Sequence, residues 1–238
     1  MTLTHSEVFE KHLGRAGPAS LIDGEWFDGS GGEITVEDPE TGRTAFVYAD
    51  GGREAAAAAL DAAEAGGAAW RGLTASARAE VLWTASRLVR ERSEALAELE
   101  AVSAGKPIRD TRVEVARVAE MLAYYAGFAD KLTGDVVPVP TSHLNIVTRE
   151  PLGTIVQLTP WNAPVFTAGW QIAPALAAGN AVVLKPSELT PSSSLALARI
   201  VHEAGVPPGA LNVVAGFGTT TGERLVSDAR VGKVVFIG

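Results

Sequence analysis

The chain has 238 residues, of which 47% are hydrophobic and 20% charged, a composition typical of a soluble globular protein with a sizeable core. Its net charge of −8 disfavours nucleic acid or an anionic membrane as a partner, and its lack of cysteine excludes disulfides and a cysteine nucleophile within these residues. The first residues lack an apolar core of signal-peptide length, and no stretch approaches ~20 consecutive apolar residues, so we expect a cytoplasmic protein.

The region 1–133 is predicted to combine a small antiparallel sheet with a set of long helices. Short β-branched and aromatic runs separated by turn residues predict a strand and tight turn at 21–27 and strands at 33–36 and 44–48. Alanine-rich and amphipathic stretches, with capping residues before them and glycine or proline after them, predict helices at 53–65, 77–92, 94–103 and 109–131. Apolar residues at helical spacing indicate packing, so this region is expected to support the remainder of the chain.

Residues 134–151 differ in composition from the predicted helices before them. Two β-branched runs, 136–139 and 144–148, are joined by a short polar link and contain Pro138 and Pro140. Proline is tolerated in edge strands and turns, so the pattern predicts a β-hairpin that projects as an arm. Such an arm is suited to pairing with another subunit.

From residue 152 to 238 the pattern is an alternation of strands and helices. Strands are predicted at 155–158, 181–184, 211–214 and 233–237, and helices at about 165–178, 192–204 and 222–227. Short apolar strands connected by helices are typical of an α/β fold with an open parallel, Rossmann-like sheet and helices on both faces. In such a sheet, ligands bind beyond the carboxyl ends of the strands.

Polar residues follow the first two of these strands. Asn162 comes after the first strand, and Lys185 and Glu188 after the second, so all three are expected on one rim of the sheet. Lys185 and Glu188 suit either a clasp for a ribose or an exposed ion pair, and spacing does not separate the two. Asn162 suits an oxyanion donor or the N-cap of the next helix, and the residues alone favour the cap.

A glycine-rich turn follows the third strand. Residues 216–222 form a G-x-G-x-x-x-G pattern, one residue longer than the usual dinucleotide fingerprint. The pattern fits an ordinary glycine-rich turn and, because a helix follows, a phosphate-binding turn. The four histidines are scattered and share no ligand spacing, which does not support a zinc site.

Several of these segments together resemble the aldehyde dehydrogenase superfamily. The segments are TPWNAP, ALAAGNAVVLKPSE, GFGTTTGERL and VVFIG, in that family's order and spacing, and the likeness extends back through LIDGEWFDG, DPETG and SAGKP. The resemblance implies the N-terminal part of the aldehyde dehydrogenase fold. Region 152–238 is then an incomplete NAD-binding domain on which 1–133 packs, and 134–151 is the arm of the oligomerisation region.

The resemblance also assigns roles to single residues. Asn162 matches the asparagine that stabilises the oxyanion, and Lys185 and Glu188 match the residues that hold the adenosine ribose. The other positions that match segments around the cofactor are Thr159, Pro160, Trp161, Gly218, Gly222 and Gly238. Ile237 departs from the pattern, because threonine is usual there.

The family reaction is the NAD(P)-dependent oxidation of an aldehyde to a carboxylic acid. A cysteine thiolate attacks the carbonyl, hydride passes to the nicotinamide, and water activated by a glutamate releases the acid. Both of those residues lie downstream of the matched pattern. We therefore interpret the chain as the first half of a homo-oligomeric enzyme for a small-molecule aldehyde, inactive alone, with NAD as cofactor and NADP as the alternative. Competing hypotheses are a non-catalytic nucleotide-binding or assembly module, and one half of a split enzyme.

Overall fold

The structure is a computed structural model that describes residues 4–238. Residues 1–3, which belong to region 1–133 and to the segment considered for a signal peptide, lie outside the described residues. The helices are α1 (His5–Leu13), α2 (Gly52–Gly72), α3 (Ala75–Glu91), α4 (Ser93–Ala104), α5 (Ile108–Ala126), α6 (Pro164–Ala177), α7 (Ser192–Glu203) and α8 (Glu223–Val226). The strands are β1 (Ser20–Ile22), β2 (Glu25–Phe27), β3 (Glu33–Glu37), β4 (Thr44–Ala49), β5 (Asp135–Val137), β6 (Asn145–Val147), β7 (Thr154–Leu158), β8 (Ala181–Lys185), β9 (Leu211–Val213) and β10 (Val231–Phe236).

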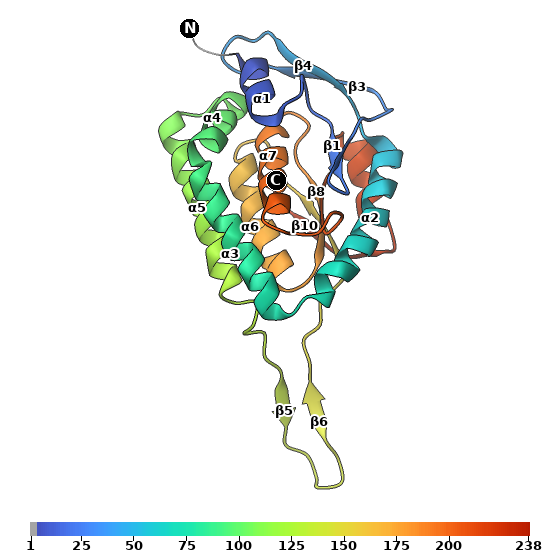
Figure 1. Ribbon diagram of the computed structural model, residues 1–238. Helices are drawn as coiled ribbons and strands as arrows, with labels where there is room; N and C mark the ends of the chain where they lie inside the picture. The colour runs from blue at the N-terminus through green and yellow to red at the C-terminus, as the bar shows by residue number, and fades with distance from the viewer. Residues whose placement is uncertain (1–3) are drawn as a thin grey trace.

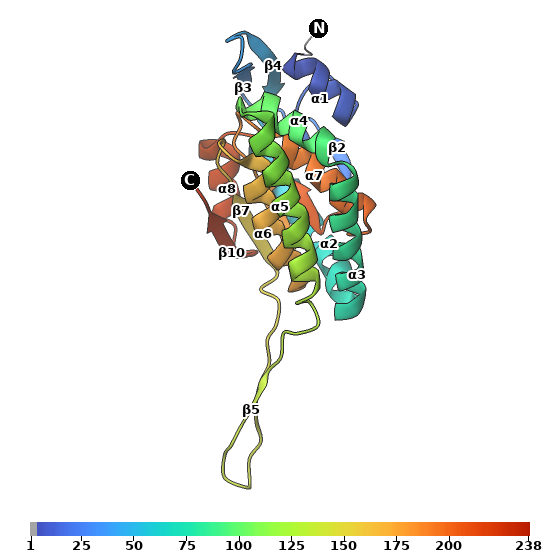
Figure 2. The ribbon, with the colours of Figure 1, turned by 90° about the vertical axis from the view of Figure 1, so that its left-hand side faces the viewer.

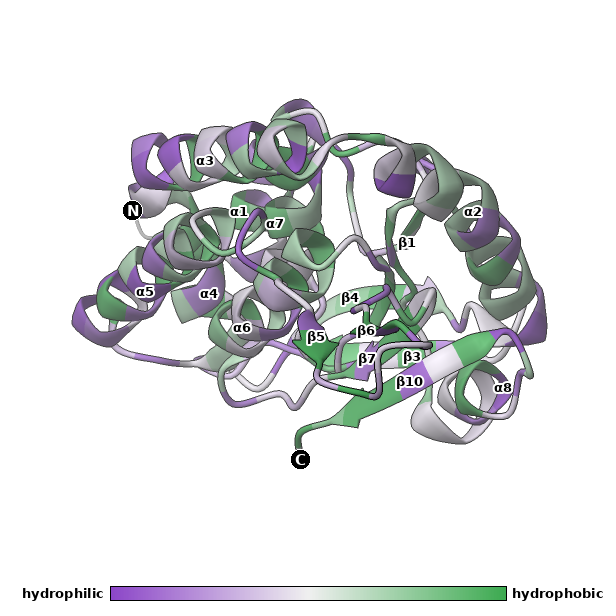
Figure 3. Ribbon diagram, turned by 90° about the horizontal axis from the view of Figure 1, so that it is seen from below, coloured by the Kyte–Doolittle hydropathy of each residue, from purple (hydrophilic) through white to green (hydrophobic). Residues whose placement is uncertain are grey.

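The main sheet has the strand order β10-β7-β8-β9-β1-β2, and β10, β7, β8 and β9 run parallel. Side chains along β8 alternate between two hydrophobic clusters. Val182 and Leu184 pack with residues of α6 and α7, whereas Ala181 and Val183 pack with residues of α2 and α8. Every residue of β8 is therefore buried, and helices cover both faces of the sheet (Figures 1 and 3). This confirms the predicted α/β class and parallel sheet.

The helices α3, α4 and α5 form a further layer outside α6 and α7 (Figure 2). In Figure 3, hydrophilic residues recur along α3 and α5, whose outer faces meet solvent. Their inner faces carry the apolar residues predicted to pack, including Val115, Val118 and Leu122, each at most 1% exposed. Within residues 4–238, none of the helices has both the length and the apolarity that crossing a membrane would require.

The first fifty residues correct the sequence-based prediction in two places. Helix α1 was not predicted, although Thr4 and Glu7 form a capping box in which the carboxylate of Glu7 accepts from the N–H of Thr4 at 2.7 Å. The strand and tight turn predicted at 21–27 form the hairpin β1–β2. Its strand β1 pairs antiparallel with β9 and so belongs to the main sheet, which was not predicted. The strands β3 and β4 form a separate two-stranded sheet. Among the described residues, the strands of this region therefore do not form the one small antiparallel sheet that was predicted.

Two predicted helix ends were also wrong. The helix predicted to end at residue 65 continues to Gly72, because Gly66 and Gly67 serve close packing and do not stop the helix. A Cβ at Gly66 would lie 2.3 Å from the backbone N of Ala210, in the loop before β9. Helix α5 ends at Ala126 rather than 131.

The predicted hairpin is present and extends away from the rest of the molecule (Figures 1 and 2). Strands β5 and β6 pair antiparallel with Val136 opposite Ile146, and all six of their residues are exposed. Each strand is shorter than predicted. In β5 the physical reason is Pro138, which lacks the N–H that a longer ladder would require.

One carboxyl group is buried in the helical layers. Glu100 in α4 is 0% exposed, and its oxygens accept from the backbone N–H of Val165, at an N···O distance of 3.3 Å, and from the hydroxyl of Ser193. Burial raises the pKa of Glu100 to about 7, against the effect of these hydrogen bonds. The negative charge of Glu114 adds to the rise, and the positive charge of Lys106 opposes it.

This raised pKa predicts that stability depends on pH. The folded protein binds the Glu100 proton more tightly than the unfolded chain, whose carboxyl titrates near 4.5. We expect this group to lower the free energy of unfolding by about 3 kcal/mol as the pH rises from 4.5 through 7, and the effect to level off about one pH unit higher. Urea denaturation of the wild type and of Glu100→Gln at several pH values measures this contribution. A difference between the two proteins that stays constant with pH would contradict the expectation.

Candidate functional site

The site is built on the carboxyl ends of two neighbouring parallel strands. In the β7–β8 pair, Leu158 lies opposite Lys185, and the N–H of Thr159 donates to the carbonyl of Lys185 at 3.2 Å. Both strands therefore end at the same edge of the sheet. The two loops after these strands are tied together by the hydroxyl of Thr190, which donates to the carbonyl of Trp161 at 3.3 Å. The structure thus places both predicted polar loops on one rim.

A groove of about 550 Å³ lies beyond this rim, between the two loops, the glycine-rich turn and the end of β10. All eight residues that the resemblance assigns to the cofactor line it, although they come from four separate segments of the chain. They are Thr159, Pro160, Trp161, Lys185, Glu188, Gly218, Gly222 and Gly238. Apolar walls are added by Val226, Phe236 and Ile237.

Lys185 and Glu188 contact each other at the floor of this groove. The ammonium of Lys185 is 3.3 Å from a carboxylate oxygen of Glu188 and donates to the carbonyl of Pro186 at 3.1 Å. Burial lowers the pKa of Lys185, and the negative charge of Glu188 opposes that change. The lysine is only 5% exposed while the glutamate side chain is 31% exposed, so this is not the exposed ion pair considered as the alternative.

Tyr48 at the end of β4 supports the Glu188 loop from behind. Its hydroxyl donates to the backbone carbonyl of Glu188 at 2.8 Å. Burial, together with the charge of Glu188 and Asp50, raises the pKa of Tyr48, so the hydroxyl keeps its proton. This residue was not singled out from the sequence, where it is only the last apolar residue of a short strand.

Asn162 lies beside the groove, in the loop that carries Trp161. Its side chain is exposed, and the N-cap position of α6 is occupied by Ala163. Among residues 4–238 no side-chain hydrogen bond caps this helix, so the N-cap interpretation of Asn162 was wrong. The amide is therefore not engaged as the cap of this helix.

The glycine-rich turn is held by a carboxylate of the protein itself. Asp50 accepts from the N–H of Phe217 at 2.9 Å, from the hydroxyl of Thr221 at 2.8 Å, and from the hydroxyl of Thr220. Burial acts to raise the pKa of Asp50, but these hydrogen bonds outweigh it and the pKa is lowered. Because Asp50 already provides the negative charge at this turn, the phosphate-binding interpretation of the turn is not favoured.

The glycines of this turn have different functions. A Cβ at Gly216 would lie 2.3 Å from the carboxylate of Asp50, so that glycine is required for packing. At Gly218 a Cβ would meet no described atom within 4 Å, and at Gly222 it would sit 3.7 Å from the Lys185 side chain. Because Gly218 and Gly222 have no side chains, they leave room in the groove for a flat ligand.

The groove fits a nucleotide in both shape and chemistry. Trp161 is 58% exposed, and Phe236 is 71% exposed, so both offer aromatic surface to a base. The carboxylate of Glu188 can accept from sugar hydroxyls and the ammonium of Lys185 can donate to sugar oxygens. The hydroxyl of Thr159 is buried and has no hydrogen-bond partner among the described residues.

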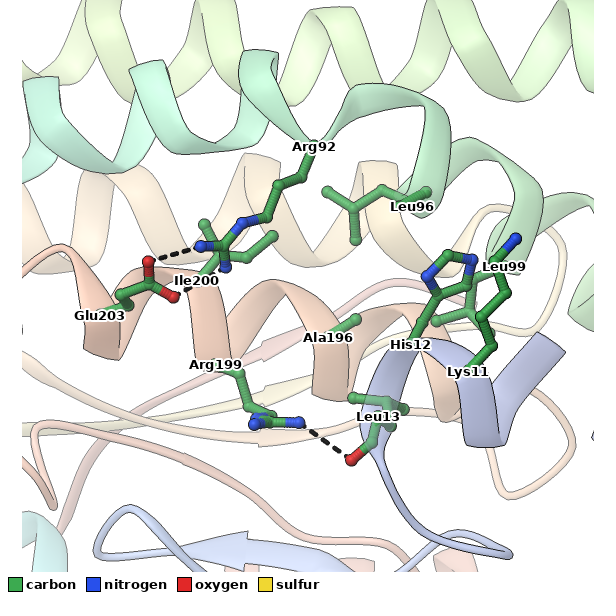
Figure 4. A pocket seen from close by; sticks show the side chains of 11 residues that line it. Lys11, His12, Leu13, Arg92, Leu96, Leu99, Ala196, Arg199, Ile200 and Glu203 are labelled. Atoms are coloured by element: carbon green, nitrogen blue, oxygen red, sulfur yellow. Dashed lines mark hydrogen bonds and ion pairs between the residues drawn. The ribbon is translucent and has the colours of Figure 1, made fainter. Parts of the chain in front are cut away.

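A second hollow, of about 470 Å³, lies between α1, α4 and α7 (Figure 4). It is rich in cations, but they are engaged within the protein. Arg92 forms a two-pronged ion pair with Glu203, with N···O distances of 2.7 and 2.5 Å, and Arg199 donates to the carbonyl of Leu13 at 2.9 Å. In the described chain, none of the predicted site residues lines this hollow. It lies away from the strand ends and does not compete with the groove.

Comparison with known proteins identifies the family. The sequence profile of the aldehyde dehydrogenase family matches residues 26–238. Betaine aldehyde dehydrogenase of Bacillus subtilis (strain 168) is 38% identical over 223 residues, which cover 92% of this chain and 45% of that protein. The crystal structure of PnpE in complex with nicotinamide adenine dinucleotide has a TM-score of 0.88 and 40% identity over 91% of this chain and 45% of that one.

PnpE comes from Pseudomonas sp. WBC-3. An NADP-dependent enzyme of E. coli matches with a TM-score of 0.87 and 37% identity, again over 91% of this chain and 45% of the other. The chain therefore spans about 45% of the length of each of these relatives. The match in sequence and in fold shows that the chain belongs to the aldehyde dehydrogenase family and has the N-terminal part of the aldehyde dehydrogenase fold.

Proposed function

We propose that this chain binds NAD and supplies one oxyanion donor for the oxidation of an aldehyde to a carboxylic acid. The observation that carries the proposal is the convergence of eight separated residues on one groove at the strand ends. Asn162 directly follows one of them, Trp161, in the same loop. Two relatives support it: one is named betaine aldehyde dehydrogenase, and the other, PnpE, has a crystal structure in complex with nicotinamide adenine dinucleotide. Because the chain spans less than half of those proteins, the complete reaction is proposed for a longer assembly.

Each part of the proposal rests on a side chain that is suited to it. Glu188 accepts hydrogen bonds from the ribose, and Lys185 donates to a ribose oxygen and neutralises the carboxylate beside it. Bound NAD would supply the hydride acceptor. The amide of Asn162 donates to the aldehyde oxygen as negative charge develops there. These 238 residues contain no cysteine, so the thiolate that attacks the aldehyde is proposed to come from outside them.

Replacement of the buried lysine tests the proposed groove. We expect the chain to bind NAD in titration calorimetry, and Lys185→Met to weaken binding at least ~tenfold, because a charge-assisted hydrogen bond is lost. Lys11→Met, in the second hollow, is the matched control and should bind NAD as the wild type does. If Lys11→Met loses NAD binding and Lys185→Met keeps it, NAD binds in the second hollow and the proposed groove is wrong.

Coenzyme choice is predicted to depend on Glu188. A carboxylate that accepts from the ribose 2′-hydroxyl repels a 2′-phosphate, so NAD should bind more tightly than NADP. Removal of the charge in Glu188→Gln should weaken NAD binding and narrow the gap between the two coenzymes. Parallel titrations of both proteins with NAD and NADP measure this. Tighter binding of NADP by the wild type would show that Glu188 does not lie at the 2′ position.

Asn162 is predicted to act on the reaction and not on coenzyme binding. In the longer enzyme, Asn162→Ala should lower kcat by roughly 10²–10³, the effect of removing one oxyanion donor. In the present chain the same change should leave both the NAD affinity and the melting temperature unaltered, since Asn162 is not the helix cap. A kcat reduced less than about threefold would rule out the role of oxyanion donor.

We also propose that the β5–β6 arm pairs with another subunit to form a homo-oligomer. Supporting this, apolar side chains along the arm are exposed, with Val136 at 69%, Leu144 at 76% and Ile146 at 56%. Changing Ile146 to Lys should shift the sedimentation coefficient toward the monomer and leave the melting of an isolated monomer unchanged. Identical sedimentation of the wild type and the variant would argue against the arm as an interface.

A further inference from the structure

The buried carboxyl of Glu100 lies at the start of two helices that each follow one loop of the groove. One oxygen is 3.4 Å and the other 3.3 Å from the backbone N of Val165, the second residue of α6. The hydroxyl of Ser193, the second residue of α7, donates to the same carboxyl. Helix α4 therefore contacts both helix starts through a single side chain.

Neither helix has a cap of its own. The first N–H groups of a helix lack partners within it, and a side chain at the N-cap usually accepts from them. The N-cap residues are Ala163 for α6 and Pro191 for α7, and within residues 4–238 no side-chain hydrogen bond caps either helix. Glu100 accepts from Val165 in place of such a cap.

The position of Glu100 defines where both loops end. The loop from Thr159 to Ala163 runs from β7 to α6 and carries Asn162, while the loop after Lys185 runs from β8 to α7 and carries Glu188. Pairing of the two strands fixes where each loop begins. Contact with Glu100 fixes where each one ends, so the side chains between these points are held in relation to each other.

The need to fill this buried space does not explain why the side chain at position 100 carries a carboxyl group. Apolar residues of similar volume often replace buried charged groups with no loss of stability, or with a gain. The carboxyl lies where donors from two different elements meet: Oε2 accepts from both Val165 and Ser193, and Oε1 from Val165. This arrangement determines geometry, which an apolar side chain would not.

We propose that Glu100 is a positioning residue for the groove: by joining the starts of α6 and α7, it holds Asn162 and the Lys185–Glu188 pair in register. It touches neither the groove nor a ligand and acts through the two loops. The inference rests on the proposed function, because the consequence of positioning is NAD affinity. Its structural part, the ordering of the two loops, can be measured without any ligand.

The test compares Glu100→Met, which fills the space without an acceptor, with Glu100→Gln, which keeps one acceptor oxygen for Val165 and an amide for Ser193. We expect Glu100→Met to bind NAD about five- to tenfold more weakly, the equivalent of a lost cap, and Glu100→Gln to restore binding to within about twofold of the wild type. Hydrogen exchange should become faster in peptides covering 159–170 and 186–197 of Glu100→Met only.

Ser103→Ala is the matched control. Ser103 is buried one turn further along α4, and its hydroxyl lies 2.9 Å from Nε2 of His5, on the side that faces α1. This change removes a buried polar contact of the same helix without touching the loops. It should lower the melting temperature and leave both NAD affinity and loop exchange as in the wild type.

The outcomes separate the two proposals. If the wild type does not bind NAD, the proposed function fails, and the exchange of the two loop peptides still decides whether Glu100 holds them. Wild-type NAD affinity and wild-type exchange in Glu100→Met would overturn the positioning role. Should Glu100→Met fail to fold, Glu100→Asp, which withdraws the carboxyl by one carbon, must show the same weakened binding and faster exchange, or the inference is wrong.

Discussion

The site depends on the register of the β7–β8 pair. Leu158 and Lys185 lie opposite each other at the last rung, so both loops leave the sheet at the same level. A slip of one residue would turn every side chain of one strand to the other face of the sheet. Val182 and Leu184 would then face α2 and α8 instead of α6 and α7, and Lys185 would move away from the groove. Burial on both faces therefore enforces the register, and the register brings Glu188 and Trp161 within reach of one ligand.

The N-terminal region holds the segments that line the groove and is therefore more than an outer support. Tyr48, the second-last residue of strand β4, donates to the backbone of Glu188, and Asp50, just after the strand, holds the glycine-rich turn. Strand β1 extends the main sheet beyond β9. The groove is thus walled by residues 158–238 but secured by residues of the first fifty, so a change in that segment reaches the ligand side through hydrogen bonds.

Buried polar groups at the helix starts explain why the core is not wholly apolar. Parallel strands connected by helices place several helix N-termini at the ligand edge, and the N–H groups there need acceptors. Asp50 and Glu100 provide carboxyl groups at such points. The hydrogen bonds to Asp50 outweigh the desolvation of its charge, whereas those to Glu100 do not, and its pKa stays raised. Both carboxylates come from the N-terminal half of the chain, which ties the two regions together.

The sequence by itself determined the alternating strands and helices from residue 152 onward, the projecting hairpin, and the placement of Lys185, Glu188 and Asn162 on one rim. These features arise from local periodicity and from the geometry of parallel strands. Only the tertiary structure decided that Asn162 is not a helix cap, that Lys185 is buried, and that Tyr48, Asp50 and Glu100 secure the loops. The roles of Tyr48, Asp50 and Glu100 rest on contacts between residues 140, 167 and 93 positions apart, which form through packing and leave no local pattern in the chain.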